Sequence, residues 1–218
     1  MRKRTEPTRA ERMKQAIRHR QDQEKLELRQ TILRAASELF LEQGYEKFSM
    51  RGLAERIGYS ATTLYLYFRD KDDLLFAVVD EGFTRFERQL EAVAASKDDP
   101  WERLMALGEA YISFGLHNPA YYELMFMQRT DFLMSSKPGT QEPRITAFLV
   151  LEQTVQQAID AGVIIPGNAK AYSDALWAQM HGIVSLAISS TDSFFQGERL
   201  REAIEAARSM IFRGLHQA

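Results

Sequence analysis

Large apolar residues recur at every third or fourth position along most of the chain, with polar residues between them and no sustained alternation of period two. This spacing gathers apolar side chains on one face of an α-helix. Only six prolines and twelve glycines interrupt the pattern. We therefore predict an all-α protein, in which a small N-terminal group of helices precedes a larger helical body.

The N-terminal part of the pattern predicts four helices. Their expected ranges are residues 23–44, 49–58, 61–68 and 71–95. Gly44 and Gly58 are expected to end the first two helices in the left-handed conformation that glycine tolerates. Ser49 and Ser60 are expected N-caps, because a serine hydroxyl accepts a hydrogen bond from an unpaired backbone N–H of the first turn.

The segment Ser96-Lys97-Asp98-Asp99-Pro100 marks the expected boundary between the two parts. Beyond it, helices are predicted at about 101–117, 121–127, 143–161, 169–190 and 196–216, with a loop at 128–142. We expect a homodimer formed through the last two of these helices. The small and apolar residues expected to face the second copy are Leu176, Ile183, Leu186, Ala187, Ala203, Ala207, Met210 and Ile211.

The formal net charge of −2 conceals an uneven distribution. Residues 1–71 hold 16 basic and 10 acidic side chains, whereas residues 72–218 hold 12 and 20. The first 20 positions alone hold eight basic and two acidic residues. Residues 1–22 are therefore expected to form a basic N-terminal arm, flexible or as a helical extension, that meets a polyanion. The alternative is a solvated tail without a partner.

The chain has no cysteine, which excludes disulfides and thiolate metal ligation and favours the reducing cytoplasm. No apolar run approaches the ~18 residues of a membrane-spanning helix, and no signal-peptide pattern follows the basic N-terminus. None of the four histidines has a Glu three residues before it, and nucleotide-binding and hydrolase motifs do not occur. We expect a cytoplasmic protein with no membrane partner, no metal, no cofactor and no catalytic residues.

The most informative segment runs from Ser49 to Phe68. Ala54 is small enough for two helices to cross, Gly58 supplies the turn four residues later, and Leu64 anchors the second helix. This spacing indicates a helix-turn-helix, although other helical hairpins also contain an alanine and a glycine four residues apart.

This segment and its flanks resemble the tetracycline-repressor (TetR) family of bacterial regulators. The residues that carry the resemblance are Ala35-Ala36-Ser37-Glu38-Leu39-Phe40, Gly44-Tyr45, Ser49, Leu53-Ala54, Gly58-Tyr59-Ser60, Thr63-Leu64-Tyr65, Tyr67-Phe68 and Lys71-Asp72-Asp73-Leu74-Leu75. The resemblance implies a DNA-binding domain at residues 23–70, a connecting helix at 71–95, and a ligand-binding and dimerisation domain at 96–218.

The resemblance also implies nine residues at an interface with double-stranded DNA. They are Ser49, Arg51, Ser60, Ala61, Thr62, Thr63, Tyr65, Tyr67 and Lys71. Ala61, Thr62 and Thr63 would open the recognition helix at the floor of the major groove. Ser49, the two tyrosines and Lys71 would bind phosphates, and Arg51 would reach a base edge or a phosphate. Alternatively, one of the two tyrosine rings belongs to the core.

Two C-terminal segments resemble a subgroup of the family that has a Trp, a His and a Gly in the penultimate long helix. They run from Phe114 to Phe126 and from Ala175 to Gly182. Trp177 and His181 are four residues apart and share a helical face, so they are candidates to meet a small-molecule effector. The predicted ligand-binding residues are Tyr111, Phe114, Tyr122, Met125, Phe126, Trp177 and His181. Alternatively, these side chains only pack in the core.

Together these features predict a ligand-responsive transcriptional regulator, a repressor that a small apolar or aromatic effector releases from a palindromic operator. A helical-bundle enzyme and a regulator controlled by a protein partner are the alternatives.

Overall fold

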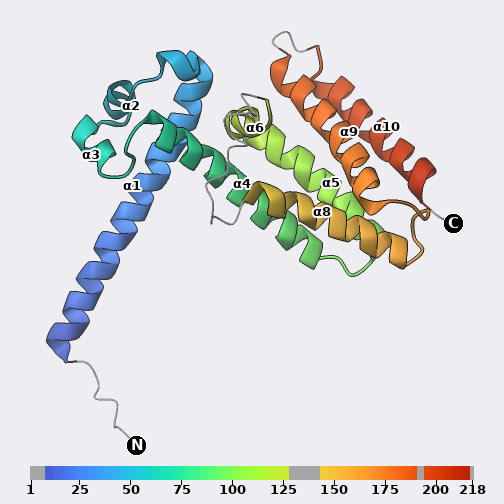
Figure 1. Ribbon diagram of the computed structural model, residues 1–218, viewed down its shortest axis with the longest axis horizontal. Helices are drawn as coiled ribbons and strands as arrows, with labels where there is room; N and C mark the ends of the chain where they lie inside the picture. The colour runs from blue at the N-terminus through green and yellow to red at the C-terminus, as the bar shows by residue number, and fades with distance from the viewer. Residues whose placement is uncertain (1–7, 128–142, 191–193, 217–218) are drawn as a thin grey trace, which may run out of the picture. The chain divides into compact units, whose positions relative to one another are not determined.

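The computed structural model describes residues 8–127, 143–190 and 194–216 (Figure 1). Within these ranges the chain forms nine helices, and its one pairing of extended backbone is an isolated bridge between Ile164 and His216. The predicted all-α class is confirmed, while the predicted loop at 128–142 lies outside the described residues. The chain divides into two compact units, Met1–Leu75 and Phe76–Ala218.

The first unit contains α1 (Arg9–Lys47), α2 (Met50–Ile57), α3 (Ala61–Tyr65) and the start of α4 (Lys71–Ala95). Apolar side chains from all four helices are buried in one core. They are Ile32, Leu33, Ala36, Leu39, Phe40, Phe48, Met50, Leu53, Ala54, Leu64, Phe68, Leu74 and Leu75. The rings of Phe40 and Phe48 stack with their centroids 3.9 Å apart, which holds the end of α1 against the chain leading into α2.

The helix α1 begins at Arg9, about fourteen residues before the helix start expected from the apolar pattern. Of the two forms considered for the basic arm, residues 9–22 therefore adopt the helical one. The side chains from Arg12 to Glu27 are exposed, so this part of α1 buries no apolar surface in its own unit. The apolar pattern did not show this part of the helix because, among the described residues of the first unit, its side chains are not buried by any other element.

Two helix ends also differ from the expectation. Gly44 has a positive φ of 72°, but its ψ of 166° is not left-handed helical, so α1 continues across a kink to Lys47. The helix α3 ends at Tyr65, where residue 68 was expected. The N–H groups of residues 67 and 68 both donate to the Leu64 carbonyl, at 2.9 and 3.0 Å, and close a turn. Phe68 is nevertheless buried, so its place in the apolar pattern reflects core packing outside a helix.

The second unit contains the rest of α4 together with α5 (Pro100–His117), α6 (Pro119–Phe126), α8 (Pro143–Asp160), α9 (Ala169–Ser189) and α10 (Gly197–Leu215). These bounds lie within two residues of the predicted ones. The helices α5, α8 and α9 pack against one another, and α10 lies along α9 (Figure 1). In the described ranges, no helix is long and apolar enough to cross a membrane.

Two glycines allow helices of the second unit to approach closely. A Cβ atom at Gly115 of α5 would overlap Val184 Cγ1 of α9 and would lie 3.0 Å from the ring of Tyr122. A Cβ atom at Gly82 of α4 would lie 2.5 Å from Met125 Sδ of α6. Because real Cβ atoms do not come this close, both crossings depend on the absence of a side chain.

The helix α10 is amphipathic, yet none of its described side chains is buried. Met210 is 66% exposed and Phe212 is 49% exposed. On α9, Leu186 is exposed, whereas Ile183 and Ala187 are buried within the unit. Leu176 is buried as well. These three side chains therefore offer little surface to a second copy, because helical spacing alone does not distinguish the inner apolar face of α9 from an outer one.

Candidate nucleic-acid interface and ligand site

The helices α2 and α3 form a helix-turn-helix whose two starts are capped as predicted. At α2, the Gly52 N–H donates to Ser49 Oγ at 3.0 Å. At α3, the Thr63 N–H donates to Ser60 Oγ at 3.1 Å, and the two hydroxyl oxygens lie 2.8 Å apart. Gly58 has left-handed φ and ψ of 74° and 29°, and its N–H closes the end of α2. Short-range contacts therefore fix both helices and the turn between them.

Around α3, polar, aromatic and apolar side chains are left open to solvent. Thr62 is exposed, Tyr65 is 53% exposed, and Leu66, directly after the helix, is 80% exposed. Ala61 and Thr63 are only half-exposed, and the Thr63 hydroxyl is already engaged in the helix cap. The exposed recognition face is therefore Thr62, Tyr65 and Leu66. Leu66 was not among the residues predicted from the sequence to contact DNA.

Two predicted DNA contacts already have partners in the protein. Arg51 Nε donates to Glu55 Oε1 at 3.1 Å, one turn further along α2, in a pair exposed to solvent. Such exposed pairs contribute little to stability, so Arg51 can exchange this partner. Lys71 Nζ donates to the Tyr45 carbonyl at 3.0 Å and lies 4.0 Å from the centroid of the Tyr45 ring. An ammonium group has three N–H donors, which leaves two on Lys71 for a phosphate.

Arg56 joins α2 to α1 and was not identified from the sequence. Its two terminal nitrogens donate to both carboxylate oxygens of Glu42, at 2.5 and 2.7 Å, and one of them lies 3.4 Å from Glu38. The hydrogen bond from Arg56 lowers the pKa of Glu42 because it favours the carboxylate. Glu42 and Glu38 lie 14 and 18 residues before Arg56 in the sequence. No rule of local spacing could therefore show that Arg56 orients α2.

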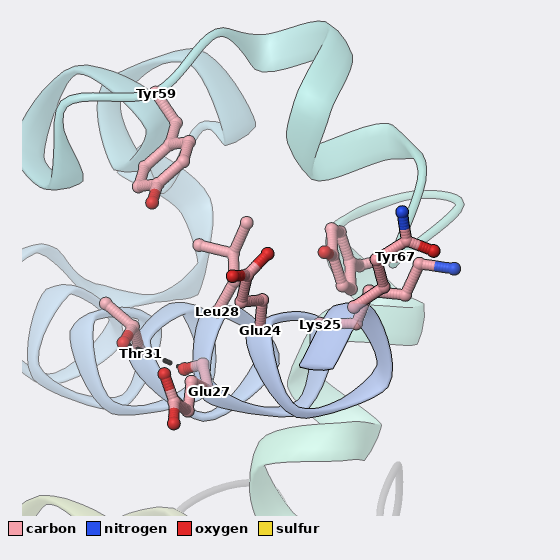
Figure 2. A pocket seen from close by; sticks show the side chains of 8 residues that line it. Glu24, Lys25, Glu27, Leu28, Thr31, Tyr59 and Tyr67 are labelled. Carbon is pink, nitrogen blue, oxygen red and sulfur yellow. Dashed lines mark hydrogen bonds between the residues drawn. The ribbon is translucent and has the colours of Figure 1, made fainter. Parts of the chain in front are cut away.

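A groove of about 780 Å³ lies between α1 and the helix-turn-helix (Figure 2). It is lined by Gln21, Glu24, Lys25, Glu27, Leu28, Thr31, Tyr59 and Tyr67. Figure 2 shows Tyr59 pointing towards α1 from the opposite wall. The carboxylates of Glu24 and Glu27 and the ammonium group of Lys25 line the α1 side of the groove. Tyr65 is 53% exposed, so its ring does not belong to the core, whereas Tyr67 is partly buried.

In the second unit, four of the predicted ligand residues form a chain of hydrogen bonds. Trp177 Nε1 donates to the Tyr111 hydroxyl at 3.1 Å. The hydroxyl oxygens of Tyr111 and Tyr122 lie 2.9 Å apart, and the Tyr122 oxygen lies 2.7 Å from His181 Nδ1. Tyr111 and Tyr122 are buried, whereas Trp177 and His181 are partly exposed. The chain therefore runs from a buried centre to two accessible rings.

Phe126 connects this hydrogen-bonded chain to α4. Its ring centroid lies 4.9 Å from Tyr122 and 6.0 Å from His181. On the α4 side, it lies 5.3 Å from Phe83 and 6.1 Å from Phe86. Phe83 and Phe86 therefore join Tyr111, Tyr122, Phe126, Trp177 and His181 in one aromatic cluster, and neither was among the predicted ligand residues.

The two remaining predicted ligand residues lie at the margin of the cluster. Phe114 is buried and contacts Phe86, with the ring centroids 5.0 Å apart. Met125 is buried against Gly82 of α4. Both side chains therefore act as packing between the aromatic cluster and neighbouring helices.

Burial sets the protonation of the cluster. It raises the pKa of Tyr111 to about 12, against the opposing effect of hydrogen bonds with Tyr122 and Trp177. Burial also raises the pKa of Tyr122 and lowers the pKa of His181. The site is therefore uncharged near neutral pH. Among the described residues, no group of three His, Asp or Glu side chains is arranged to hold a metal ion.

Two family profiles match the chain. Residues 32–78 match bacterial regulatory proteins of the tetR family, and residues 104–210 match the tetracyclin repressor-like C-terminal domain. Together the two matches cover more than half of the chain and include the helix-turn-helix and most of the second unit. The protein belongs to the TetR family.

Named relatives and solved structures agree with this assignment. The HTH-type transcriptional activator FasR of Mycolicibacterium smegmatis is 33% identical over 115 residues, 53% of this chain and 52% of that protein. The fatty acid metabolism regulator protein of Bacillus subtilis is 27% identical over 108 residues, 49% of this chain and 56% of that protein. The chain thus spans about half the length of the curated relatives it matches.

The matches to solved structures extend over nearly the whole length of those structures. The TetR family regulator PfmR of Thermus thermophilus matches with a TM-score of 0.68 and 22% identity, over 85% of this chain and 99% of its own. A protein of unknown function from Rhodococcus sp. RHA1 matches with a TM-score of 0.69 and 28% identity, over 87% and 96%. The fold is that of TetR-type regulators.

Proposed function

We propose that this protein is a ligand-responsive transcriptional regulator that binds operator DNA as a homodimer and acts as a repressor. The observation that carries the proposal is the exposed face of Thr62, Tyr65 and Leu66 on a helix-turn-helix held by two serine caps. Threonine offers a hydroxyl and a methyl group to base edges, and an apolar side chain suits the thymine methyl group. Membership of the TetR family supports the same activity.

The proposed division of the chain follows the sequence analysis. Residues 1–22 form a basic arm, 23–70 bind DNA, 71–95 connect, and 96–218 bind the ligand and form the dimer. We infer no catalytic role for any part, because the family is one of transcriptional regulators.

The nine DNA-binding residues divide into three roles. Ser49, Tyr65, Tyr67 and Lys71 bind phosphates, and the Ser49 hydroxyl is suited to this because it accepts in the cap and keeps its own hydrogen to donate. Arg51 and Thr62 contact bases. The remaining three residues, Ser60, Ala61 and Thr63, hold the recognition helix at the groove floor.

The test is DNA binding measured by fluorescence anisotropy on an operator found by genome-wide footprinting. Lys71→Ala should weaken binding to every duplex and lower the slope of log K against log salt by about 0.9. Thr62→Ala should instead change which bases are preferred. Lys170→Ala, an exposed lysine of the second unit, is the matched control. An unchanged salt slope for Lys71→Ala would exclude the phosphate role.

The dimer is proposed to form through α9 and α10. An apolar groove of about 250 Å³ on these helices is lined by Tyr172, Ala175, Leu176, Gln179, Met210, Ile211 and Leu215. The exposed side chains of Met210 and Phe212 extend the apolar surface. A second copy would bury both. Light scattering should show a dimer at micromolar concentration and a monomer for Met210→Glu, while a wild-type monomer would contradict the interface.

We propose that the effector binds at the accessible edge of the aromatic cluster, formed by Phe126, Trp177 and His181. Phe126 contacts Phe83 and Phe86, so a ligand that moves its ring displaces α4. The helix α4 begins in the DNA-binding unit. Its displacement by the ligand would therefore be transmitted along the chain to that unit. A 100-fold loss of operator affinity corresponds to about 2.7 kcal/mol of coupling. Titration of the effector with and without operator should show the same factor, and equal affinities would contradict the switch.

A further inference from the structure

The direction of the hydrogen bonds in the aromatic cluster follows from one residue that has a donor and no acceptor. The indole of Trp177 only donates, so the Tyr111 oxygen must accept its N–H. Each tyrosine hydroxyl has a single hydrogen to donate. The hydrogens of Tyr111 and Tyr122 can then be placed in more than one way.

Three arrangements satisfy the contact of 2.9 Å between the tyrosine oxygens. In the first, Tyr111 donates to Tyr122, and Tyr122 donates to His181 Nδ1. In the second, His181 Nδ1 donates to Tyr122, and Tyr122 donates to Tyr111. The Tyr111 oxygen then accepts twice, and its own hydrogen has no acceptor among the described residues, although the side chain is only 4% exposed. In the third, Tyr111 and His181 Nδ1 both donate to Tyr122, whose own hydrogen then has no acceptor among the described residues. Only the first arrangement uses every hydrogen of the chain, and an unused buried donor is costly.

The first arrangement fixes the tautomer of His181. Because Nδ1 accepts from Tyr122, a neutral imidazole carries its hydrogen on Nε2. Protonation at Nδ1 would leave the hydrogen of either Tyr111 or Tyr122 unused. Within the described residues, no group forms a hydrogen bond with Nε2.

The surroundings of His181 make this nitrogen a suitable ligand contact. The imidazole is partly exposed, and its centroid lies 5.6 Å from Trp177 and 6.0 Å from Phe126, whose rings are also partly exposed. We infer that His181 Nε2–H is a fixed donor in an aromatic site, and that the effector is an uncharged apolar molecule with a hydrogen-bond acceptor, such as a ketone or ester oxygen. This inference rests on the proposed function of the site, and it adds the chemical class of the ligand.

The tautomer is tested by long-range ¹H–¹⁵N NMR of the histidine side chains in the full-length protein near pH 7.5. We expect the shifts of an Nε2-protonated ring for His181, assigned with His181→Gln. A ring protonated at Nδ1, or a charged ring, would overturn the inference. This measurement needs neither DNA nor effector, so a failure of operator binding by the wild-type protein would overturn the proposed function alone.

The ligand class is tested with two probes of nearly the same shape, acetophenone and ethylbenzene, of which only the first has an acceptor. The measured quantity is the ratio of the Kd of acetophenone to the Kd of ethylbenzene, determined for each variant. The different solubility of the two probes in water affects this ratio equally in every variant, so it cancels when variants are compared. His181→Phe keeps a ring but removes the donor, and should shift the ratio against acetophenone by about fivefold. His181→Gln keeps an acceptor for Tyr122 and a donor for the ligand, and should restore most of the ratio. An unchanged ratio in His181→Phe, or no binding of acetophenone to the wild type up to its solubility limit, would overturn the proposal.

Discussion

At the scale of single residues, Gly115 is a position where packing between two helices leaves no room for a side chain. The overlap of an added Cβ with Val184 Cγ1 costs about 1–3 kcal/mol, while alanine in a helix gains up to about 1 kcal/mol over glycine. Gly115→Ala should therefore lower the free energy of unfolding by up to about 2 kcal/mol, measured by urea denaturation. Gly182→Ala is the control, since nothing lies within 4 Å of its added Cβ. It should stabilise the protein by about 0.5–1 kcal/mol, and equal effects of both changes would contradict the packing argument.

A second residue-scale prediction concerns acid stability. Burial lowers the pKa of His181 in the folded protein, whereas the unfolded chain titrates near 6.5. The unfolded chain therefore binds a proton that the folded protein does not. The contribution of His181 is fully present above pH 6.5, falls as the pH is lowered, and levels off below the folded pKa. The titratable groups in contact with the ring, Tyr122 and through it Tyr111, stay neutral because burial raises their pKa.

The measurement is the free energy of unfolding between pH 8 and pH 5 for wild type and His181→Gln. The stability advantage of the wild type should shrink as the pH falls. His19→Gln, on the exposed part of α1, is the control variant. A constant difference between wild type and His181→Gln would mean that His181 has the same pKa in both states.

At the scale of the element, the prediction concerns the exposed part of α1 and its effect on the salt dependence of DNA binding. It is a helix without a packing partner in its own unit, and Arg9, Arg12, Lys14, Arg18 and Arg20 lie on it. If it contacts DNA, Arg12→Gln with Arg18→Gln should lower the salt slope of binding by up to about 1.8 and leave the base preference unchanged. Arg199→Gln with Arg201→Gln removes the same charge from α10 and is the control. If the two double variants have the same salt slope, the basic arm is a solvated tail without a partner.

At the scale of the whole molecule, the proposed dimer constrains the operator. Two recognition helices related by a two-fold axis should fit half-sites about one turn, 34–36 Å, apart. Insertion of five base pairs between the half-sites rotates one of them by about half a turn and should abolish cooperative binding. A single base change inside one half-site should cost only about 1–3 kcal/mol. Gel-shift titrations check both, and tolerance of the five-base-pair insertion would contradict a rigid dimer.

Much of the local structure could be predicted because it depends on residues within one helical turn. The Ser49 and Ser60 caps, the left-handed Gly58 and the start of α4 at Lys71 each need only neighbours three or four positions away. The bounds of α4, α5, α8, α9 and α10 followed for the same reason, whereas α1 begins about fourteen residues before its expected start. The end of α3 could not be predicted in this way, because Phe68 is buried in the core although it lies outside the helix.

Contacts between distant parts of the chain were decided only by the tertiary structure. The sequence by itself placed Trp177 and His181 on one helical face, but their partners Tyr111 and Tyr122 lie 66 and 59 residues away. Helical periodicity says which residues share a face and not which helix covers it. For that reason it could not show the ion pair of Arg56 with α1, the burial of Ile183 inside the protomer, or the direction of the hydrogen bonds that end at His181.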